Sequence, residues 1–364
     1  MRRAILISCF DWYDSRLKFI KQVLELEGYL VNIYTSDFDH SKKEKIKEFN
    51  EQINYINVPK YKKNLSVRRV YSHYFFAREI YKILNKENYD LIYCLVPPNS
   101  LVKNIYRFYR KNKKAKIYFD IIDLWPESMP IDKIKDCFIV KKWKTLRNDY
   151  LKIADKIFVE CEFYKKWLPR DVLSKTFVLH LASSNIYYDS RYKPDNSTIS
   201  FCYLGSINSL IDIESIINIV KMAKLYKTVI LNIIGGGEKT EEFLKLAKEA
   251  GATVNYYGLT YDYKTKSEVL NSSHFGLNLY NSQSIGLTIK SIDYFSAGLP
   301  IINNIKGDTW MLVKKYNLGI NIDNNMTSDI FDTYIYDRNK IYSFFQNNFT
   351  PESLKRVLLD KIDV

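Results

Sequence analysis

The sequence predicts a two-domain α/β protein in which two doubly wound parallel sheets follow one another along the chain. At 364 residues the chain exceeds what one hydrophobic core usually organises. Short β-rich runs alternate with helical patterns in both halves. The alternation stops over residues 181–198, where Ser, Asn, Asp and Tyr collect, and then restarts. We therefore expect domains at 1–180 and 199–340, a linker at 181–198, and C-terminal helices at 341–364.

The first half opens with a βαβ pattern: a strand at 4–8, a helix at 16–27 closed by Gly28, and a strand at 30–34. The later runs continue the alternation, which favours a parallel sheet covered on both faces. We expect further strands at 53–58, 91–95, 116–121, 156–160 and 177–179, and helices at 67–84, 101–110 and 140–153.

The second half repeats this pattern. Ligands of such sheets bind beyond the carboxyl ends of the strands, so the loops that follow the strands are the first place to look for chemistry. We expect strands at 199–204, 229–234, 254–257, 275–279 and 300–303, and final helices at 337–347 and 351–362.

Composition excludes several classes of protein. The five cysteines form no close pair, which indicates reduced thiols and not a disulfide framework or zinc site. The first apolar run breaks at Asp11, too early for a signal peptide. No apolar stretch approaches the roughly 20 residues that cross a bilayer as a helix. We expect a cytoplasmic protein that is not integral to the membrane.

The positive charge is confined to the first half. Residues 1–180 hold 36 Lys and Arg against 22 Asp and Glu, whereas residues 181–364 hold 19 of each. Basic clusters lie at 60–69, 107–116 and 141–147. They are typical of solvated helix faces or of a surface that meets anionic lipid. No nucleic-acid recognition motif accompanies them. We expect peripheral association with the inner face of the cell membrane and no nucleic-acid partner.

Two loops of the second half contain glycine directly after a strand. Glycine lets backbone amides approach an anion at the start of a helix, although a tight turn without ligand explains the same residues. The loops are Gly205-Ser206 and Gly235-Gly236-Gly237-Glu238. The second of these follows the strand at 229–234 and is the stronger signal of an anion site.

The most informative stretch spans residues 284–302. A loop containing Gly286, Leu287 and Thr288 leads into a helix with Lys290 and Asp293 three residues apart, on one face near the N-terminus. A lysine there can meet a diphosphate, and a carboxylate one turn later can accept both hydroxyls of a ribose. A surface salt bridge on a capped helix is the alternative.

Two motifs resemble one enzyme family. The Lys-x-x-Asp-Tyr pattern at 290–294 before Ala-Gly-Leu-Pro at 297–300 is similar to the donor-site signature of GT-B glycosyltransferases of family 4, above all those of capsule and exopolysaccharide synthesis. The segment Asp-Ile-Ile-Asp-Leu-Trp-Pro-Glu-Ser at 120–128 resembles an Asp-Leu-Trp-Pro-Glu-Ser loop of the same enzymes. A buried structural corner is the alternative for this second segment.

The resemblance implies a GT-B fold, two Rossmann-like domains facing across a cleft, and a UDP-sugar donor bound mainly by the second domain. It places Lys290 against the phosphates and Asp293 against the ribose. It brings Asp123 and Trp125 into the cleft, with Glu127 among the acceptor-binding residues. It also implies retention of anomeric configuration, with no metal and no cofactor.

The sequence departs from the family at two positions. The first carboxylate of the family's donor motif would fall at Ile285, which has no acid. The basic residue often found after the first strand of the second domain is absent from residues 208–212. The contact to the donor sugar is therefore missing or moved.

The loop after the first strand carries acids, aromatic side chains and an arginine. In this fold it faces the acceptor and the leaving diphosphate, so we expect Trp12 and Arg16 to bind acceptor. Asp11 or Asp14 could orient the acceptor hydroxyl or act as a base, as could Asp123. Asp14 could equally be the N-terminal cap of the first helix.

Other candidate residues favour plainer interpretations. Asp37-Phe38-Asp39 has the Asp-x-Asp spacing with which GT-A enzymes hold a divalent metal, but it follows a strand of a βαβ repeat, which is the wrong context. His73 lies in an aromatic helical stretch and His180 at an apolar strand end. Both are typical of core histidines with satisfied hydrogen bonds.

The sequence thus predicts transfer of a sugar from a nucleotide-sugar to a lipid-linked or oligosaccharide acceptor in bacterial surface polysaccharide synthesis. Two alternatives share the fold. One is a nucleotide-sugar 2-epimerase, which needs no acceptor. The other is a non-catalytic partner subunit, which the missing acid at Ile285 favours.

Overall fold

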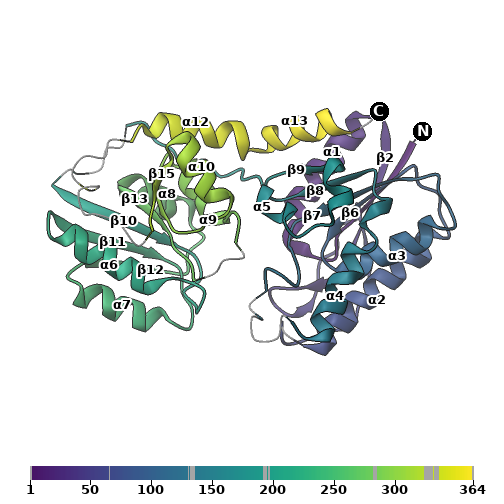
Figure 1. Cartoon of the computed structure of the whole chain (residues 1–364), viewed down its shortest axis with the longest axis horizontal. Helices are drawn as coiled ribbons and strands as arrows, with labels where there is room; N and C mark the ends of the chain where they lie inside the picture. The colour runs from purple at the N-terminus through teal and green to yellow at the C-terminus, as the bar shows by residue number, and fades with distance from the viewer. Residues whose placement is uncertain are drawn as a thin grey trace. The chain divides into compact units, whose positions relative to one another are not determined.

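The computed structural model describes residues 2–64, 66–129, 131, 136–191, 195, 197–281, 285–323, 331 and 336–362. The chain forms two compact units, one of Met1–Leu181 with Leu354–Val364 and one of Ala182–Ser353 (Figure 1). The segment expected as a linker begins the second unit, and most of the last helix belongs to the first unit.

The first unit contains a seven-stranded sheet, parallel throughout, in the order β5-β2-β1-β6-β7-β8-β9. The order reverses between β1 and β6. A short antiparallel pair, β3 and β4, lies outside it. The strands are β1 (Arg2–Ile7), β2 (Tyr29–Ser36), β3 (Phe38–Asp39), β4 (Glu44–Lys45), β5 (Ile53–Ile56), β6 (Leu91–Val96), β7 (Lys116–Ile121), β8 (Lys156–Val159) and β9 (Thr176–Val178).

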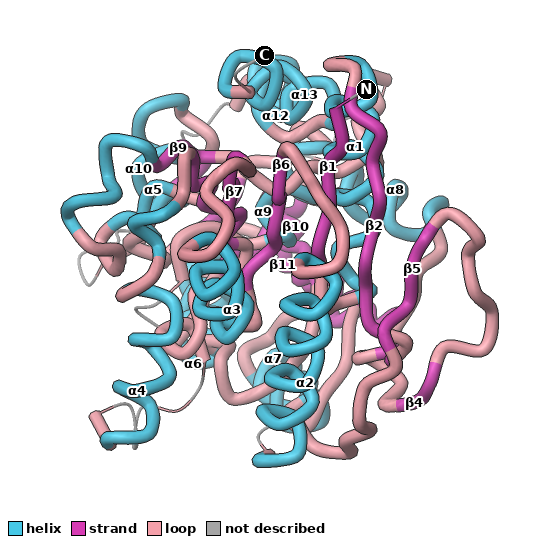
Figure 2. The backbone as a smooth tube through the Cα atoms, turned by 90° about the vertical axis from the view of Figure 1, so that its right-hand side faces the viewer, coloured by secondary structure: helices cyan, strands magenta, loops and turns pink. Residues whose placement is uncertain are grey.

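Helices cover both faces of this sheet, because right-handed crossovers place the helices before and after the reversal on opposite sides. Helices α2, α3 and α4 pack side by side on one face (Figure 2). The helical segments of the unit are η1 (Asp11–Tyr13), α1 (Asp14–Leu26), α2 (Val67–Leu84), α3 (Asn99–Tyr109), α4 (Phe138–Asn148), η2 (Leu151–Ile153), α5 (Glu162–Lys165), η3 (Arg170–Lys175) and α13 (Pro351–Lys361).

The second unit contains a six-stranded parallel sheet in the order β12-β11-β10-β13-β14-β15. Counted from its own first strand this is the order 3-2-1-4-5-6, which the first sheet also follows before adding a seventh strand. The strands are β10 (Thr198–Leu204), β11 (Thr228–Ile234), β12 (Thr253–Gly258), β13 (Phe275–Asn278), β14 (Ile301–Asn303) and β15 (Gly319–Asn321).

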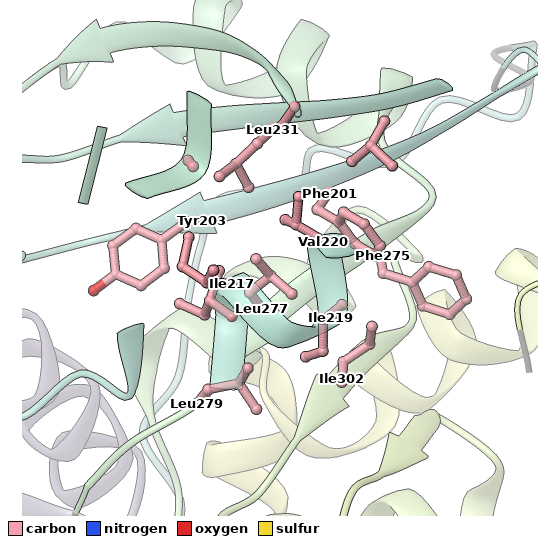
Figure 3. Close-up of a cluster of buried hydrophobic side chains, with 14 of the residues drawn as sticks. Phe201, Tyr203, Ile217, Ile219, Val220, Leu231, Phe275, Leu277, Leu279 and Ile302 are labelled. Carbon is pink, nitrogen blue, oxygen red and sulfur yellow. The ribbon is translucent and has the colours of Figure 1, made fainter. Parts of the chain in front are cut away.

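The helices of the second unit also lie on both faces of their sheet. Helices α6 and α7 pack together, and α12 packs on α9. Beneath α6 a buried cluster joins Phe201 and Leu231 of the sheet to Ile217 and Val220 of the helix (Figure 3). The helices are α6 (Ile213–Lys224), α7 (Thr240–Glu249), α8 (Tyr263–Ser272), α9 (Ile289–Ser296), α10 (Asp308–Tyr316) and α12 (Arg338–Asn348).

The fold class predicted from the sequence is confirmed: both sheets are parallel and doubly wound. Strand β6 shows why the prediction succeeded, since all six of its residues are apolar or aromatic and buried, as a central parallel strand requires. Within the described part of the chain, every helix is too short or too polar to cross a membrane.

Candidate functional site

The point where strand order reverses is the expected ligand site of a doubly wound sheet. In the second unit this point lies between β10 and β13. Gly205 follows β10, Tyr280 follows β13, and Lys290 is the second residue of α9. These three residues define the candidate donor site.

Lys290 is a buried cation that forms no ion pair within the described residues. Its side chain is 8% exposed, and its Nζ has no hydrogen-bond partner among the described residues. The Nζ atom lies 4.2 Å from the ring centre of Tyr203 and 4.6 Å from that of Tyr280. The Tyr203 ring is fixed because its hydroxyl donates to the carbonyl of Ser206 at 2.7 Å. Two aromatic rings thus partly replace the water that the ammonium has lost.

Burial lowers the pKa of Lys290 to about 7, because the charged form is poorly solvated there. Burial likewise raises the pKa of Tyr280 to about 12. Around neutral pH the amine is therefore divided between its charged and neutral forms. A bound anion would favour the charged form, so this lysine is suited to a ligand such as a diphosphate.

Asp293 lies one turn further along α9 and is paired. Its carboxylate is 3.3 Å from Nζ of Lys266, and both side chains are largely buried. Lys266 also lies 5.2 Å from the ring centre of Tyr187. Burial raises the pKa of Asp293, and Lys266 opposes that rise. Lys266 was missed by the sequence analysis, because nothing in the pattern of α8 separates it from the many surface lysines.

The two glycine loops pack against each other. A Cβ atom on Gly235 would lie 1.9 Å from the carbonyl oxygen of Gly205, and one on Gly237 would lie 2.3 Å from that of Ile207. The amide of Gly235 donates to the carbonyl of Gly258, and that of Gly237 to the hydroxyl of Thr240. At Gly235 and Gly237, therefore, glycine permits close contact between loops, and the amides are already used within the protein.

The other residues of these loops lie at or near the surface. Gly205 has φ +111°, which favours glycine whatever lies nearby. Gly205, Ser206 and Glu238 are exposed, and Gly236 is half-buried. Glu238 accepts a hydrogen bond from the amide of Ser209 at 3.3 Å.

Thr288 sets the start of α9. Its hydroxyl accepts from the amide of Ser291 at 3.2 Å and donates to Oδ1 of Asn278, at the end of β13, at 2.8 Å. Gly286 accepts from the amide and hydroxyl of Thr309, and Leu287 is buried. These three residues anchor the helix that carries Lys290, so their role here is to position it.

In the first unit, the segment from Asp123 to Glu127 forms a buried corner. Trp125 is 8% exposed, and its carbonyl accepts from Asn99 and from Arg147. Glu127 pairs with the fully buried Arg147 at 2.8 Å. The carboxylate of Glu127 thus neutralises a core arginine, and its assignment to acceptor binding finds no support in this geometry.

Arg16 was expected at the junction of the first loop and its helix, and it lies in the first turn of α1, where it is 4% exposed. Its Nε and Nη2 atoms each donate to the Asp120 carboxylate at 2.8 Å. Nη2 also donates to the carbonyl of Leu179, and Nη1 donates to the carbonyl of His180. The guanidinium therefore ties α1 to the carboxyl ends of β7 and β9, and this geometry gives no support to its assignment to acceptor binding.

The acids and the tryptophan of the first loop remain near the surface. Trp12 is 48% exposed, and Asp11 is half-buried and accepts from the amide of His40 at 3.2 Å. Asp14 is the first residue of α1 and not its N-cap. The N-cap position is occupied by Tyr13, whose side chain makes no capping hydrogen bond. The hydroxyl of Tyr13 donates to Asp123 at 2.6 Å. Burial raises the pKa of Asp11, Asp14 and Asp123.

An aromatic cluster unforeseen from the sequence surrounds Arg69 and His73 of α2 at the carboxyl edge of the first sheet. His73 is buried as expected, but its Nε2 has no hydrogen-bond partner among the described residues. Nothing local in the sequence could reveal the cluster, because its members come from five separate segments. The rings are Phe10, Trp12, Phe38, His40, Tyr61 and Trp125.

The remaining candidates have local partners. Asp37 accepts from Lys45 and from the amide of Val58, and Asp39 accepts from the amides of Ser41 and Lys42. Their hydrogen bonds shape the turn around β3. In the described part of the chain, no three His, Cys, Asp or Glu side chains are grouped as a metal site. His180 makes a 2.8 Å contact from Nδ1 to the carbonyl of Glu160.

Solved structures share this fold over the whole chain. The apo lipopolysaccharide outer core galactosyltransferase WaaB is 15% identical, with all of both chains covered and a TM-score of 0.62. Anabaena HepE in complex with UDP is 12% identical, with 99% of each chain covered and a TM-score of 0.66. The N-terminal domain of Candida albicans trehalose-6-phosphate phosphatase is 12% identical, covers 99% of this chain and 96% of its own, and has a TM-score of 0.64.

At these identities the likeness concerns the fold. No protein-family model matches the sequence, and no curated protein sequence matches it. The chain thus has the GT-B fold, with two Rossmann-like sheets of the same strand order. Its activity has to be argued from its own residues.

Proposed function

We propose that this protein is a glycosyltransferase that moves a sugar from a UDP-sugar to a lipid-linked or oligosaccharide acceptor, with retention, in bacterial surface polysaccharide synthesis. One observation carries the proposal: the buried, unpartnered Nζ of Lys290 lies where the strand order of the second sheet reverses. The UDP complex of HepE, which shares the fold, supports a uridine nucleotide as the ligand.

In this proposal Lys290 binds the diphosphate. Negative charge grows on the leaving diphosphate as the glycosidic bond breaks, and a fixed cation in a dry site stabilises that charge strongly. Asp293 receives the ribose hydroxyls by exchanging its contact with Lys266, 3.3 Å away. Lys266 would then remain beside the nucleotide, where its charge still favours an anionic ligand.

The acceptor is assigned to the first unit. Asp11 and Asp123 follow β1 and β7 at the carboxyl edge of the sheet, and burial raises the pKa of both. A raised pKa makes a carboxylate a better proton acceptor, so either can orient or deprotonate the acceptor hydroxyl. Retention is proposed because the donor motif resembles that of retaining enzymes.

Ile285 favours one alternative, a non-catalytic partner subunit, because the family's first donor-site acid is absent at that position. Incubation with UDP-sugars separates the possibilities. A transferase releases UDP when acceptor is added, and an epimerase converts the sugar without acceptor. A partner subunit binds UDP and turns nothing over.

We also propose that the first unit docks on the cytoplasmic face of the membrane. Helices α2 and α4 expose apolar side chains near their starts: Val67 is 85% exposed, Tyr71 56%, Phe138 79% and Ile139 76%. Exposed basic residues at 60–68 and 141–142 lie in these two helices or in the loop before α2, and those at 107–116 lie in α3 and the loop after it. Basic residues attract anionic lipid, and exposed apolar residues insert into the interface.

Calorimetric titration with UDP, GDP, ADP and CMP tests the donor assignment. We expect UDP to bind best, and Asp293→Ala to weaken UDP binding about tenfold through loss of the ribose contacts. Lys264→Met is the matched control, because Lys264 lies on α8 with an 82% exposed side chain. UDP affinity left unchanged by both Asp293→Ala and Lys290→Ala would end the assignment.

A further inference from the structure

Two polar side chains on one face of α2 are buried without the partners they need. Arg69 is 6% exposed and His73 is 4% exposed, and they are four residues apart. Nε of Arg69 and Nε2 of His73 have no hydrogen-bond partner among the described residues. Buried polar groups are nearly always hydrogen-bonded, so this pair needs an explanation.

Aromatic rings cover the Arg69 guanidinium. Its central carbon lies 4.4 Å from the ring centre of Trp125, 5.7 Å from that of Tyr61 and 6.0 Å from that of Phe10. The His73 ring stacks on Trp125 at 6.0 Å between centres. Aromatic faces stabilise a cation, but they do not supply an acceptor for the Nε–H at the edge of the guanidinium.

The acidic side chains nearby do not supply those acceptors. Asp11 accepts from the amide of His40, and Asp123 accepts from the hydroxyl of Tyr13. Within the described ranges no carboxylate forms an ion pair with Arg69, whose Nη1 donates to the carbonyl of Asn64 at 3.1 Å. This differs from Arg16 of the same unit, which is held by both oxygens of Asp120.

We infer that Arg69 and His73 bind an anionic group, a phosphate or a carboxylate, carried by the acceptor. A guanidinium presents a planar fork of donors that matches both groups. The site lies at the carboxyl edge of the first sheet, beside Trp12, whose ring is 48% exposed and stacks on His40. An exposed ring there can cover the face of a sugar next to the anion. Naming the ligand as the acceptor rests on the proposed function.

The test uses the full chain carrying Lys290→Met, so that the donor site does not contribute to anion binding. Inorganic phosphate, dodecyl phosphate, glucuronate and methyl glucoside are titrated by calorimetry. We expect the three anions to bind and methyl glucoside to bind at least tenfold more weakly. Tighter binding of dodecyl phosphate than of glucuronate identifies a phosphorylated acceptor, and the reverse order identifies an acidic sugar.

Adding Arg69→Met should weaken anion binding at least tenfold, whereas adding Arg78→Met should not. Arg78 is an exposed residue of the same helix and serves as the matched control. His73→Leu gives a second variant should Arg69→Met fail to fold. Anion binding that is absent, or equal in the Arg69 and Arg78 variants, overturns the inference. UDP binding by the chain with an intact Lys290 is measured separately, with and without Arg69→Met, and UDP binding that is unchanged by Arg69→Met reports on the donor site.

Discussion

Among the described residues, each unit contains a buried cation that forms no ion pair with a carboxylate, near the carboxyl edge of a sheet with the same strand order. In the second unit Lys290 lies between the rings of Tyr203 and Tyr280. In the first unit Arg69 lies against Trp125 and Tyr61. Both cations lie against aromatic rings, and within the part of the chain that the structure describes, Nζ of Lys290 and Nε of Arg69 have no hydrogen-bond partner.

The two cations differ in how they can relieve the cost of burial. A lysine can lose its proton, and burial lowers the pKa of Lys290 to about 7. An arginine stays charged in proteins, so only an anion or an aromatic face can compensate it. On the proposals above, the lysine site would bind an anion only while Lys290 is protonated, whereas the arginine site would keep its charge at every pH.

The largest effect we expect is a difference in the free energy of unfolding between a variant of Arg16, which pairs with a buried carboxylate, and a variant of Arg69, which we propose binds a ligand. Arg16→Met should lower the free energy of unfolding by about 3–5 kcal/mol, because it leaves the buried Asp120 carboxylate without its partner. Arg69→Met should be neutral or stabilising, since it leaves no buried carboxylate unpaired. Urea unfolding of both variants measures this, and an equal loss in both would remove the distinction.

The next effect concerns the stability of the nucleotide-free protein. Lys290→Met should be more stable than the wild type below pH 7, because it removes a buried charge. The folded-state pKa of about 7 lies below the ordinary value of 10.5, so between these values the unfolded chain binds more protons. Wild-type stability should therefore rise with pH in this window, by at most about 1.4 kcal/mol per pH unit, and the advantage of the variant should shrink.

Chemical unfolding of the two proteins between pH 6 and 9 measures this difference. Lys264→Met, which alters an exposed lysine of the same unit, should follow the wild type at every pH. A constant difference between the wild type and Lys290→Met across this range would mean that Lys290 does not titrate in it.

Membrane docking should show the smallest effect per residue, about 1 kcal/mol for each basic side chain near an anionic surface. Replacing Lys62, Lys63 and Arg68 together by serine should weaken co-sedimentation with anionic vesicles at low salt. The control variant replaces three lysines of the second unit, Lys245, Lys248 and Lys264, by serine. The difference should fade as the Debye length falls from about 10 Å at 0.1 M to about 3 Å at 1 M. Equal loss in both triple variants would show that the excess lysine is compositional.

Much of the fold could be predicted from the sequence, because buried parallel strands such as β6 are continuous apolar runs. Lys290 could be found for a similar reason: its motif is local, with spacing set by one helix. Its burial between two tyrosines could not be predicted, because Tyr203 lies in β10 whereas Tyr280 follows β13, and the two meet only through the strand order.

The first unit was harder to predict. Arg16 and Glu127 are charged residues in or near loop-like sequence, which favours a surface role, yet both neutralise buried partners that are distant in the chain. Arg69 lies in a basic cluster typical of a solvated face, and only the tertiary structure separates it from Arg68, which is exposed. Long-range pairing of charges leaves no local pattern in a sequence.

The central claim, that Lys290 binds the diphosphate of a UDP-sugar, is tested most directly by the UDP affinity of wild type, Lys290→Arg and Lys290→Met between pH 7 and 9. The wild-type affinity should fall as pH rises, by up to about tenfold per pH unit, because binding requires the charged amine. Lys290→Arg should bind UDP with little dependence on pH, and Lys290→Met should bind about 100-fold more weakly than the wild type at pH 7. Wild-type affinity retained by Lys290→Met at pH 7 would contradict the account.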